Sequence, residues 1–148
     1  MNLSFASVPF LVVRVPELKP QTVADFMSTR VVTSDPEDHI SQIASSMQRH
    51  NVGSVVIMKN QRIVGILTER DFVRIVEKVG MLLKEDQAKH FMAKPVITVQ
   101  SDASVTDAIK LMQVNHIRHL IVLDKDLRMV GMISARDLMK ATRESMEI

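Results

Sequence analysis

The chain of 148 residues contains no cysteine, tryptophan or tyrosine, and only five phenylalanines. Without cysteine it has neither a disulfide framework nor a thiolate ligand for a metal, which is consistent with a reducing compartment. Basic residues number 19 and acidic residues 17, so the charge is nearly balanced. Nucleic-acid binders usually concentrate basic charge on one face beside stacking aromatics, so the composition gives no support to nucleic-acid binding.

Long apolar runs and glycine-rich loops are missing as well. The apolar run at residues 8–13 is too short to cross a bilayer, is interrupted by Pro9 and is followed by Arg14. Because no signal-peptide pattern is evident, we predict a cytoplasmic protein that does not associate with membranes. Four glycines are too few for a phosphate-cradling loop, and there is no nucleophile elbow or dinucleotide fingerprint. We therefore expect no catalytic residues and no enzymatic activity.

What the chain does contain is an internal repeat in a composition that is 46% hydrophobic, enough for a core that needs no metal. The pair Phe26-Met27 returns as Phe91-Met92, 65 positions later. The heptapeptide GILTERD at 65–71 returns as GMISARD at 131–137, 66 positions later, so one residue was gained in a polar turn. We divide the chain into an N-terminal extension (1–19), a first repeat (20–83) and a second repeat (84–148).

Each repeat predicts the order β-α-β-β-α. Asp35, Pro36 and Glu37 are typical of a helix start, and apolar residues at helical spacing follow them. The apolar runs 55–58 and 120–123 predict buried strands, and each has a hairpin partner, at 63–67 and 129–133. A second helix is expected near the aspartate of the repeated heptapeptide. The fold class is therefore α/β (α+β) with two repeats, and residues 11–15 of the extension are strand-like.

The repeated motif is glycine, two apolar residues, Ser or Thr, any two residues, and Asp. Gly65 and Gly131 lie inside predicted strands, where glycine often marks the close approach of a ligand or of other backbone. Ser or Thr followed three residues later by an acid is also the pattern of a helix capping box. The same hydroxyl and carboxylate could instead hold a phosphate and a ribose. The spacing leaves both interpretations open.

Histidine is the remaining candidate metal ligand. His116 and His119 are three positions apart, but the sequence supplies no cysteine and no third ligand at helical spacing. Because zinc normally takes three or four protein ligands, we predict no metal site.

The doubled pattern of strand, helix, hairpin and motif resembles a tandem pair of cystathionine β-synthase (CBS) domains, often called a Bateman module, over about residues 20–144. The resemblance implies two β-α-β-β-α repeats related by a pseudo-twofold axis, with two clefts between them that bind adenosyl ligands. In that family the motif aspartate contacts ribose, and the Ser or Thr lies beside the sugar or phosphate. It therefore implies Asp71 with Thr68 in one cleft, and Asp137 with Ser134 in the other.

The resemblance also implies that each cleft takes residues from the opposite repeat. The Asp71 cleft would receive Ile117, Arg118 and His119, and the Asp137 cleft would receive Val52, Gly53 and Ser54. Arg118 and His119 stand where the γ subunit of AMP-activated kinase carries basic residues facing phosphate. Arg136 is expected in that same cleft, and Arg70 in the Asp137 cleft. Adenine contacts are expected from Thr22, Val23, Val32 and Ile133 in one cleft and from Ala88, Ile97 and Leu67 in the other.

Taken together, these features predict a regulatory module that needs no cofactor and binds AMP, ADP or ATP as its ligand. It would act through self-association, with a homodimer as the expected minimum, or through a regulated protein in trans. One alternative is a structural module with empty clefts, whose aspartates only cap helices. Another is a binder of S-adenosylmethionine, NAD or nucleic acid, although Arg118 and His119 argue against a cationic sulfonium in their cleft.

Overall fold

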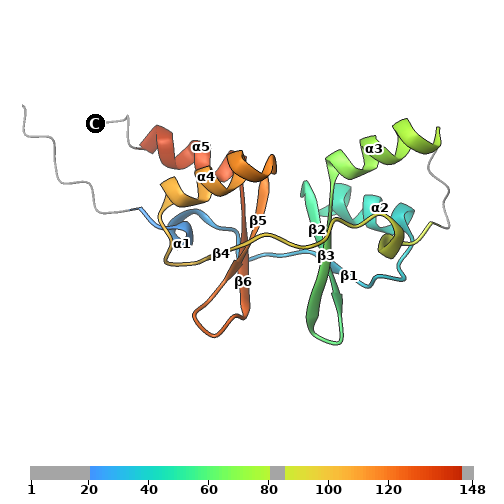
Figure 1. Ribbon diagram of the computed structural model, residues 1–148, viewed down its shortest axis with the longest axis horizontal. Helices are drawn as coiled ribbons and strands as arrows, with labels where there is room; N and C mark the ends of the chain where they lie inside the picture. Colours follow the sequence, from blue (N-terminus) through green and yellow to red (C-terminus); the bar gives the residue numbers. More distant parts are fainter. Residues whose placement is uncertain (1–20, 81–85, 145–148) are drawn as a thin grey trace, which may run out of the picture.

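The computed structural model describes residues 21–80 and 86–144, which form two lobes side by side along the long axis of the molecule (Figure 1). The extension at 1–19, with the strand expected at 11–15, lies outside the described residues. The described part has no helix that is both long and apolar enough to span a membrane. In the first repeat the elements are α1 (Val23–Phe26), β1 (Thr33–Ser34), α2 (Ile40–His50), β2 (Ser54–Lys59), β3 (Arg62–Thr68) and α3 (Glu69–Val79). In the second repeat they are the 3-10 turn η1 (Ala88–His90), β4 (Thr98–Gln100), α4 (Val105–Asn115), β5 (His119–Leu123), β6 (Met129–Ser134) and α5 (Ala135–Glu144).

The predicted order β-α-β-β-α is confirmed in both repeats. Each repeat forms a three-stranded sheet, in which the first strand pairs parallel to the second and the second pairs antiparallel to the third. Both helix pairs lie on one side of the molecule, and the turns of both hairpins lie on the opposite side (Figure 1). The α+β fold class is therefore also confirmed.

The central strands are buried on both faces because the two sheets pack against each other. Val55 and Ile57 belong to the core beneath the first helix pair, so Val56 between them points to the other face, where it is also fully buried. Ile121 has the same position in the second repeat and is equally buried. Ser54, on the same face as Val56, donates a hydrogen bond to Met132 Sδ of the second repeat at 2.7 Å.

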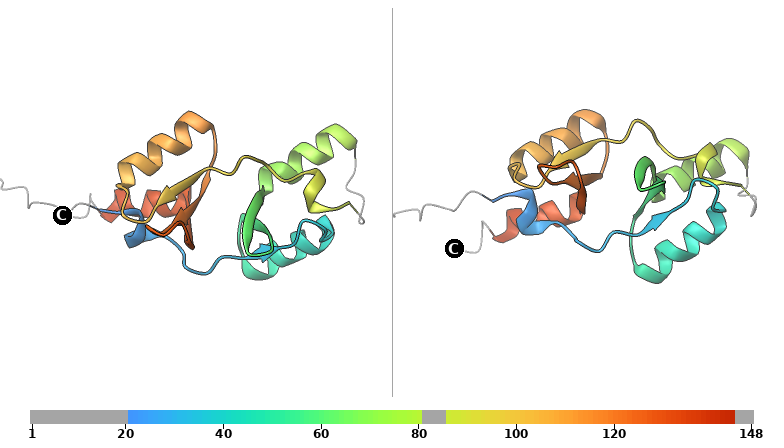
Figure 2. Two further views of the ribbon diagram at one scale, coloured as in Figure 1. Left: turned by 60° about the horizontal axis from the view of Figure 1, so that its bottom comes forward. Right: turned by 90° about the horizontal axis from the view of Figure 1, so that it is seen from below.

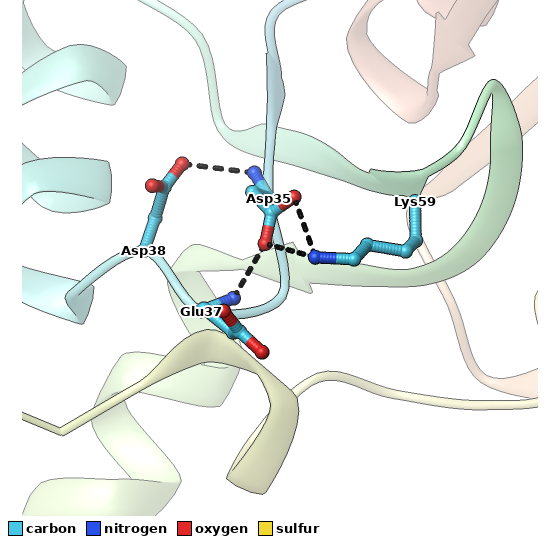
Figure 3. A network of polar contacts seen from close by, with 4 residues as sticks. All are labelled: Asp35, Glu37, Asp38 and Lys59. Atoms are coloured by element: carbon cyan, nitrogen blue, oxygen red, sulfur yellow. Dashed lines mark hydrogen bonds and ion pairs between the residues drawn. The ribbon is translucent and has the colours of Figure 1, made fainter.

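The helix start predicted at Asp35 is wrong, because α2 begins at Ile40. The Asp35 carboxylate instead accepts the backbone N–H of Glu37 at 3.0 Å and pairs with Lys59 Nζ at 3.3 Å, while Asp38 accepts the N–H of Asp35 (Figure 3). The Glu37 N–H, with a smaller contribution from Lys59, holds the pKa of Asp35 below its usual value. These bonds close a turn rather than a helix.

The first residues of each repeat pack onto the other lobe. Ser28 exchanges two backbone hydrogen bonds with Met132, at 2.8 and 2.9 Å, and Ala93 exchanges two with Ile66, at 2.8 and 3.2 Å. Figure 2 shows the segments that carry these residues running between the lobes. The boundary at 83/84 therefore separates the repeats in the sequence but not the lobes in space, because each lobe contains residues of both repeats.

These crossing segments explain the two motif glycines. A Cβ atom at Gly65 would lie 2.5 Å from Met92 Sδ, and one at Gly131 would lie 2.7 Å from the carbonyl oxygen of Ser28. Both distances are shorter than real Cβ contacts. At Gly131 the approaching group is backbone, one of the two groups predicted, whereas at Gly65 it is the side chain of Met92, which was not predicted.

Candidate functional site

The two motif aspartates have the same geometry. Asp71 Oδ2 accepts hydrogen bonds from the backbone N–H and the hydroxyl of Thr68, at 2.8 and 2.9 Å. Asp137 Oδ2 accepts the same two bonds from Ser134, at 2.8 and 2.7 Å. The capping interpretation of the motif is therefore realised in both repeats.

Capping uses only one carboxylate oxygen of each aspartate. Asp71 is 8% exposed, and its Oδ1 lies 3.8 Å from Nη1 of Arg74, one turn further along α3. Asp137 is partly exposed, and no hydrogen bond within residues 21–80 and 86–144 involves its Oδ1. Each motif thus combines a helix N-terminus, which favours negative charge, with a second carboxylate oxygen that capping leaves over.

His119, at the start of β5, lies against the start of α3 in the opposite repeat. A Cβ atom at Gly53 would lie 3.2 Å from His119 Nε2 and 3.4 Å from a carboxylate oxygen of Glu69. Burial lowers the pKa of His119, the carboxylates of Glu69 and Asp137 oppose that shift, and Arg118 adds to it. Gly53 and His119, which we expected in different clefts, therefore lie close together. Glu69 lies beside them and was not predicted from the sequence.

The arginines near the two motifs are used differently. Arg70, expected in the Asp137 cleft, donates from Nη1 to the carbonyl oxygen of His116 at 2.8 Å and so ties the first repeat to the end of α4. Arg118 and Arg136 are exposed, and within the described part of the chain their side chains make no hydrogen bond or ion pair. The backbone N–H of Ala135 donates to the carbonyl of Arg118 at 2.9 Å, which places Arg118 at the start of α5 beside Arg136.

The predicted adenine contacts divide by burial. Thr22, Val32 and Ile97 are partly exposed, whereas the other four are completely buried. These four are Val23, Leu67, Ala88 and Ile133. Core packing encloses their side chains and leaves no surface that an adenine ring could contact in this arrangement.

A groove with a volume of about 330 Å³ lies between α4 and α5. Its lining is mostly apolar, and it includes Ile117, which we expected at the Asp71 cleft. The sequence indicates this groove only through apolar residues on α4 and α5 that lie outside the faces buried in the core. The lining residues are Ile109, Met112, Gln113, Ile117, Ala135, Leu138, Met139 and Thr142.

Two further residues predicted for the Asp137 cleft are Val52 and Ser54. Val52 is partly buried against the core of the first repeat, and Ser54 is buried between the two sheets. Nowhere in residues 21–80 and 86–144 do three His, Asp or Glu side chains gather closely enough to hold a metal ion.

Comparison with known proteins places this architecture in a family. The family model described as "CBS domain" matches residues 23–78 and again residues 88–144. An uncharacterized protein of Methanopyrus kandleri is 34% identical over 124 residues; the match covers 83% of this chain and 63% of that protein. The chain therefore spans less than two thirds of that relative.

Solved structures show the same arrangement. A crystal structure of a CBS domain is 31% identical, with a TM-score of 0.78, and the match covers 84% of this chain and 99% of that one. A CBS domain pair crystallised with 5′-methylthioadenosine and S-adenosyl-L-methionine has a TM-score of 0.77 at 22% identity, covering 85% of this chain and 98% of that one. At this identity the second likeness concerns the fold alone.

Proposed function

This chain belongs to the CBS-domain family, and on that basis we propose that it is a regulatory module that binds an adenine nucleotide between its two repeats. The observation that carries the proposal is the doubled motif, in which Asp71 and Asp137 each keep one carboxylate oxygen beyond the capping bonds. A carboxylate at that position can accept the hydroxyl protons of a ribose through charge-assisted hydrogen bonds.

Arg118 and Arg136 are the groups proposed to bind the phosphates. Both guanidinium groups are exposed, and a guanidinium can donate two parallel hydrogen bonds to phosphate oxygens. They lie at the start of α5, where the helix dipole also favours an anion. Arg70 is less suited to this role because it already bonds the carbonyl of His116.

The CBS domain pair solved with methylthioadenosine and S-adenosylmethionine supports an adenosyl ligand as a class. The charge at the start of α5 favours an anionic member of that class, since a sulfonium cation beside two arginines would be repelled. AMP, ADP and ATP therefore fit this end of the module better than S-adenosylmethionine does.

A second candidate function is a structural module without a nucleotide. The favouring observation is that Thr68 and Ser134 already satisfy one oxygen of each aspartate, so the motif has a complete structural role in the free chain. Such a module would assemble proteins without responding to adenosyl compounds.

Regulation by a ligand requires two arrangements that bind it with different affinity. We propose that the response passes through self-association or through a protein in trans. A homodimer is the simplest form of this proposal.

The deciding experiment is titration calorimetry with AMP, ADP, ATP, S-adenosylmethionine and NAD on the unaltered chain and on Asp71→Asn and Asp137→Asn. Asparagine keeps an oxygen that can accept the capping bonds but removes the charge offered to ribose. Loss of a charge-assisted bond costs about 1.5–3 kcal/mol, so at least one variant should lose about tenfold or more in affinity.

Adenosine provides the matched control for the phosphate contacts. Arg118→Ala should weaken ATP binding strongly and adenosine binding little, because only ATP carries the charge that Arg118 binds. Equal losses for both ligands would remove Arg118 from the phosphate site. If no adenosyl compound binds or raises the melting temperature, the structural module is the correct function.

A further inference from the structure

The groove between α4 and α5 is an apolar surface that the described residues leave open. Its volume is about 330 Å³, and Met139 on its border is 69% exposed. The backbone N–H of Ala135 donates a hydrogen bond to the carbonyl of Arg118, so one end of the groove lies at Ile117. The other end lies at Ile109, one turn into α4. An apolar groove of this size is typical of a site that another segment or molecule covers.

The described structure begins beside this second end of the groove. The carbonyl of Gln21 accepts the N–H of Val105, the first residue of α4, at 3.1 Å, and the N–H of Val23 donates to the carbonyl of Ala103 at 2.9 Å. Residues 21–24 therefore run antiparallel to residues 101–105, and the direction from Val23 to Gln21 leads toward α4. The helix that follows, α1, lies beside α5 (Figure 1, Figure 2).

The first repeat has an equivalent entry point with a different segment in front of it. There the carbonyl of Asp86 accepts the N–H of Ile40, the first residue of α2, at 2.7 Å. Only residues 81–85 separate Asp86 from Gly80 at the end of α3, so the chain arrives from the helix pair of its own lobe. In the second repeat the segment in front of Gln21 is instead the N-terminal extension.

The extension has the apolar residues that such a groove requires. Its residues 8–13 are Val, Pro, Phe, Leu, Val and Val, and large apolar side chains of this kind favour burial. Leu11, Val13 and Val15 stand at alternate positions, so in an extended segment their side chains share one face.

The length of the extension is sufficient for it to reach the groove. The stretch from Val13 to Gln21 spans about 26 Å when extended, whereas α4 from Val105 to Gln113 in the groove is about 12 Å long. A short flexible tether also gives an effective concentration of the order of mM. That exceeds the concentration of a separate molecule in a micromolar solution and favours the chain's own extension as the occupant.

We propose that residues 11–15 of the N-terminal extension dock in the α4–α5 groove of the same chain, with Leu11, Val13 and Val15 facing α4 and α5. The inference does not depend on nucleotide binding. It assigns a place to the extension and an occupant to the groove, and neither belongs to the two motifs.

Cysteine cross-linking in the full chain tests this docking directly, because the chain has no cysteine of its own. The test variant combines Val13→Cys with Gln113→Cys, which lies in the groove lining. The matched control combines Val13→Cys with Val114→Cys, the next position on α4, which is 77% exposed but outside the lining. Under oxidation at micromolar concentration, the disulfide within one chain should form about tenfold faster in the test variant than in the control. Non-reducing electrophoresis and mass spectrometry follow it.

Three results would overturn the proposal. Equal rates in the two variants would mean that the tethered cysteine meets α4 at random. A disulfide mainly between chains would assign the groove to the extension of another copy. No disulfide in either variant would mean that the extension does not dock in the groove and that another molecule or segment covers it.

The absence of tryptophan allows an independent readout. Leu11→Trp supplies a single fluorophore, whose emission lies at shorter wavelength when its ring is removed from water. Adding Met139→Glu should shift the emission to longer wavelength, because a carboxylate on the border of the groove disfavours apolar docking. Leu127→Glu is the matched control and should cause no shift, because Leu127 is 70% exposed but lies in the turn between β5 and β6, away from the helices. Equal shifts from both changes, or the emission of a fully exposed ring in Leu11→Trp itself, would contradict the docking.

Discussion

At the start of α3 the backbone N–H of Glu69 donates a hydrogen bond to the carbonyl oxygen of Gly53. At the start of α5 the backbone N–H of Ala135 donates one to the carbonyl oxygen of Arg118. The backbone therefore has the same arrangement at the two equivalent helix starts, but the charged side chains around it differ. The first has an acidic residue and an arginine tied to the opposite repeat, while the second has two exposed arginines. The backbone symmetry thus does not extend to the side chains that would meet a ligand, and the repeats can serve different roles.

The largest difference expected between the repeats concerns the motif glycines. Gly131→Ala should lower the free energy of unfolding by about 3 kcal/mol, because the new methyl group meets the backbone carbonyl of Ser28, which also accepts the Met132 N–H. Gly65→Ala should cost about half as much, since Met92 is a flexible side chain that can move aside. Urea denaturation of both variants measures the difference. Equal losses would mean that the two crossing segments are equally rigid.

A smaller difference is expected between the equivalent arginines. Arg70→Ala removes the bond to the His116 carbonyl and should lower the free energy of unfolding by about 1 kcal/mol. Arg136→Ala should change it by less than about 0.5 kcal/mol, because Arg136 is an exposed surface residue. Thermal unfolding without ligand checks both values. ATP titration should show the reverse order, and a large stability loss in Arg136→Ala would contradict its assignment to phosphate.

The smallest expected effect is a dependence of stability on pH that comes from His119 in the second repeat. His119 has a lowered pKa because it is partly buried, and its equivalent in the first repeat is Ser54. Below the ordinary histidine value of 6.5 the unfolded chain takes up a proton before the folded chain does. The free energy of unfolding should therefore fall as the pH drops from 6.5 to the lowered pKa and should not depend on this group above 6.5.

His119→Ser makes the two repeats alike and should remove this contribution. Urea denaturation of the wild type and the variant, above and below pH 6.5, isolates it from other titrating groups. His50→Ser is the control for replacing an exposed histidine by serine. An identical pH slope in wild type and His119→Ser would show that burial of His119 does not affect its protonation.

The elements could be predicted from the sequence because their signals are local. The apolar runs 55–58 and 120–123 fall inside β2 and β5, and the motif aspartates lie in the first turns of α3 and α5. The exception is Asp35, which has the residue type and neighbours of a helix cap. Its carboxylate pairs with Lys59, 24 residues away, and the carbonyl groups of its turn accept hydrogen bonds from the backbone of η1. Neither partner can be identified from the local pattern.

The candidate site depended more on long-range packing. The motif residues and the arginines were identifiable by type and by repetition. The burial of Leu67 and Ile133 instead arises from packing in the two cores, and the proximity of Glu69 to His119 arises from a contact between repeats. Arg70 and Arg136 occupy the same motif position, yet only Arg70 reaches the end of the opposite helix. A repeat in sequence predicts equivalent backbone but does not predict which side chains become partners.

By itself, then, the sequence determined the duplicated unit, its order of strands and helices, and the two capped helix starts. These follow from hydrophobic periodicity and from hydrogen bonds between residues a few positions apart. Only the tertiary structure decided which segments cross between lobes, which residues stay accessible to a ligand and where the apolar groove opens. These depend on which surfaces meet when the two sheets pack, and that is a property of the entire chain rather than of any one segment.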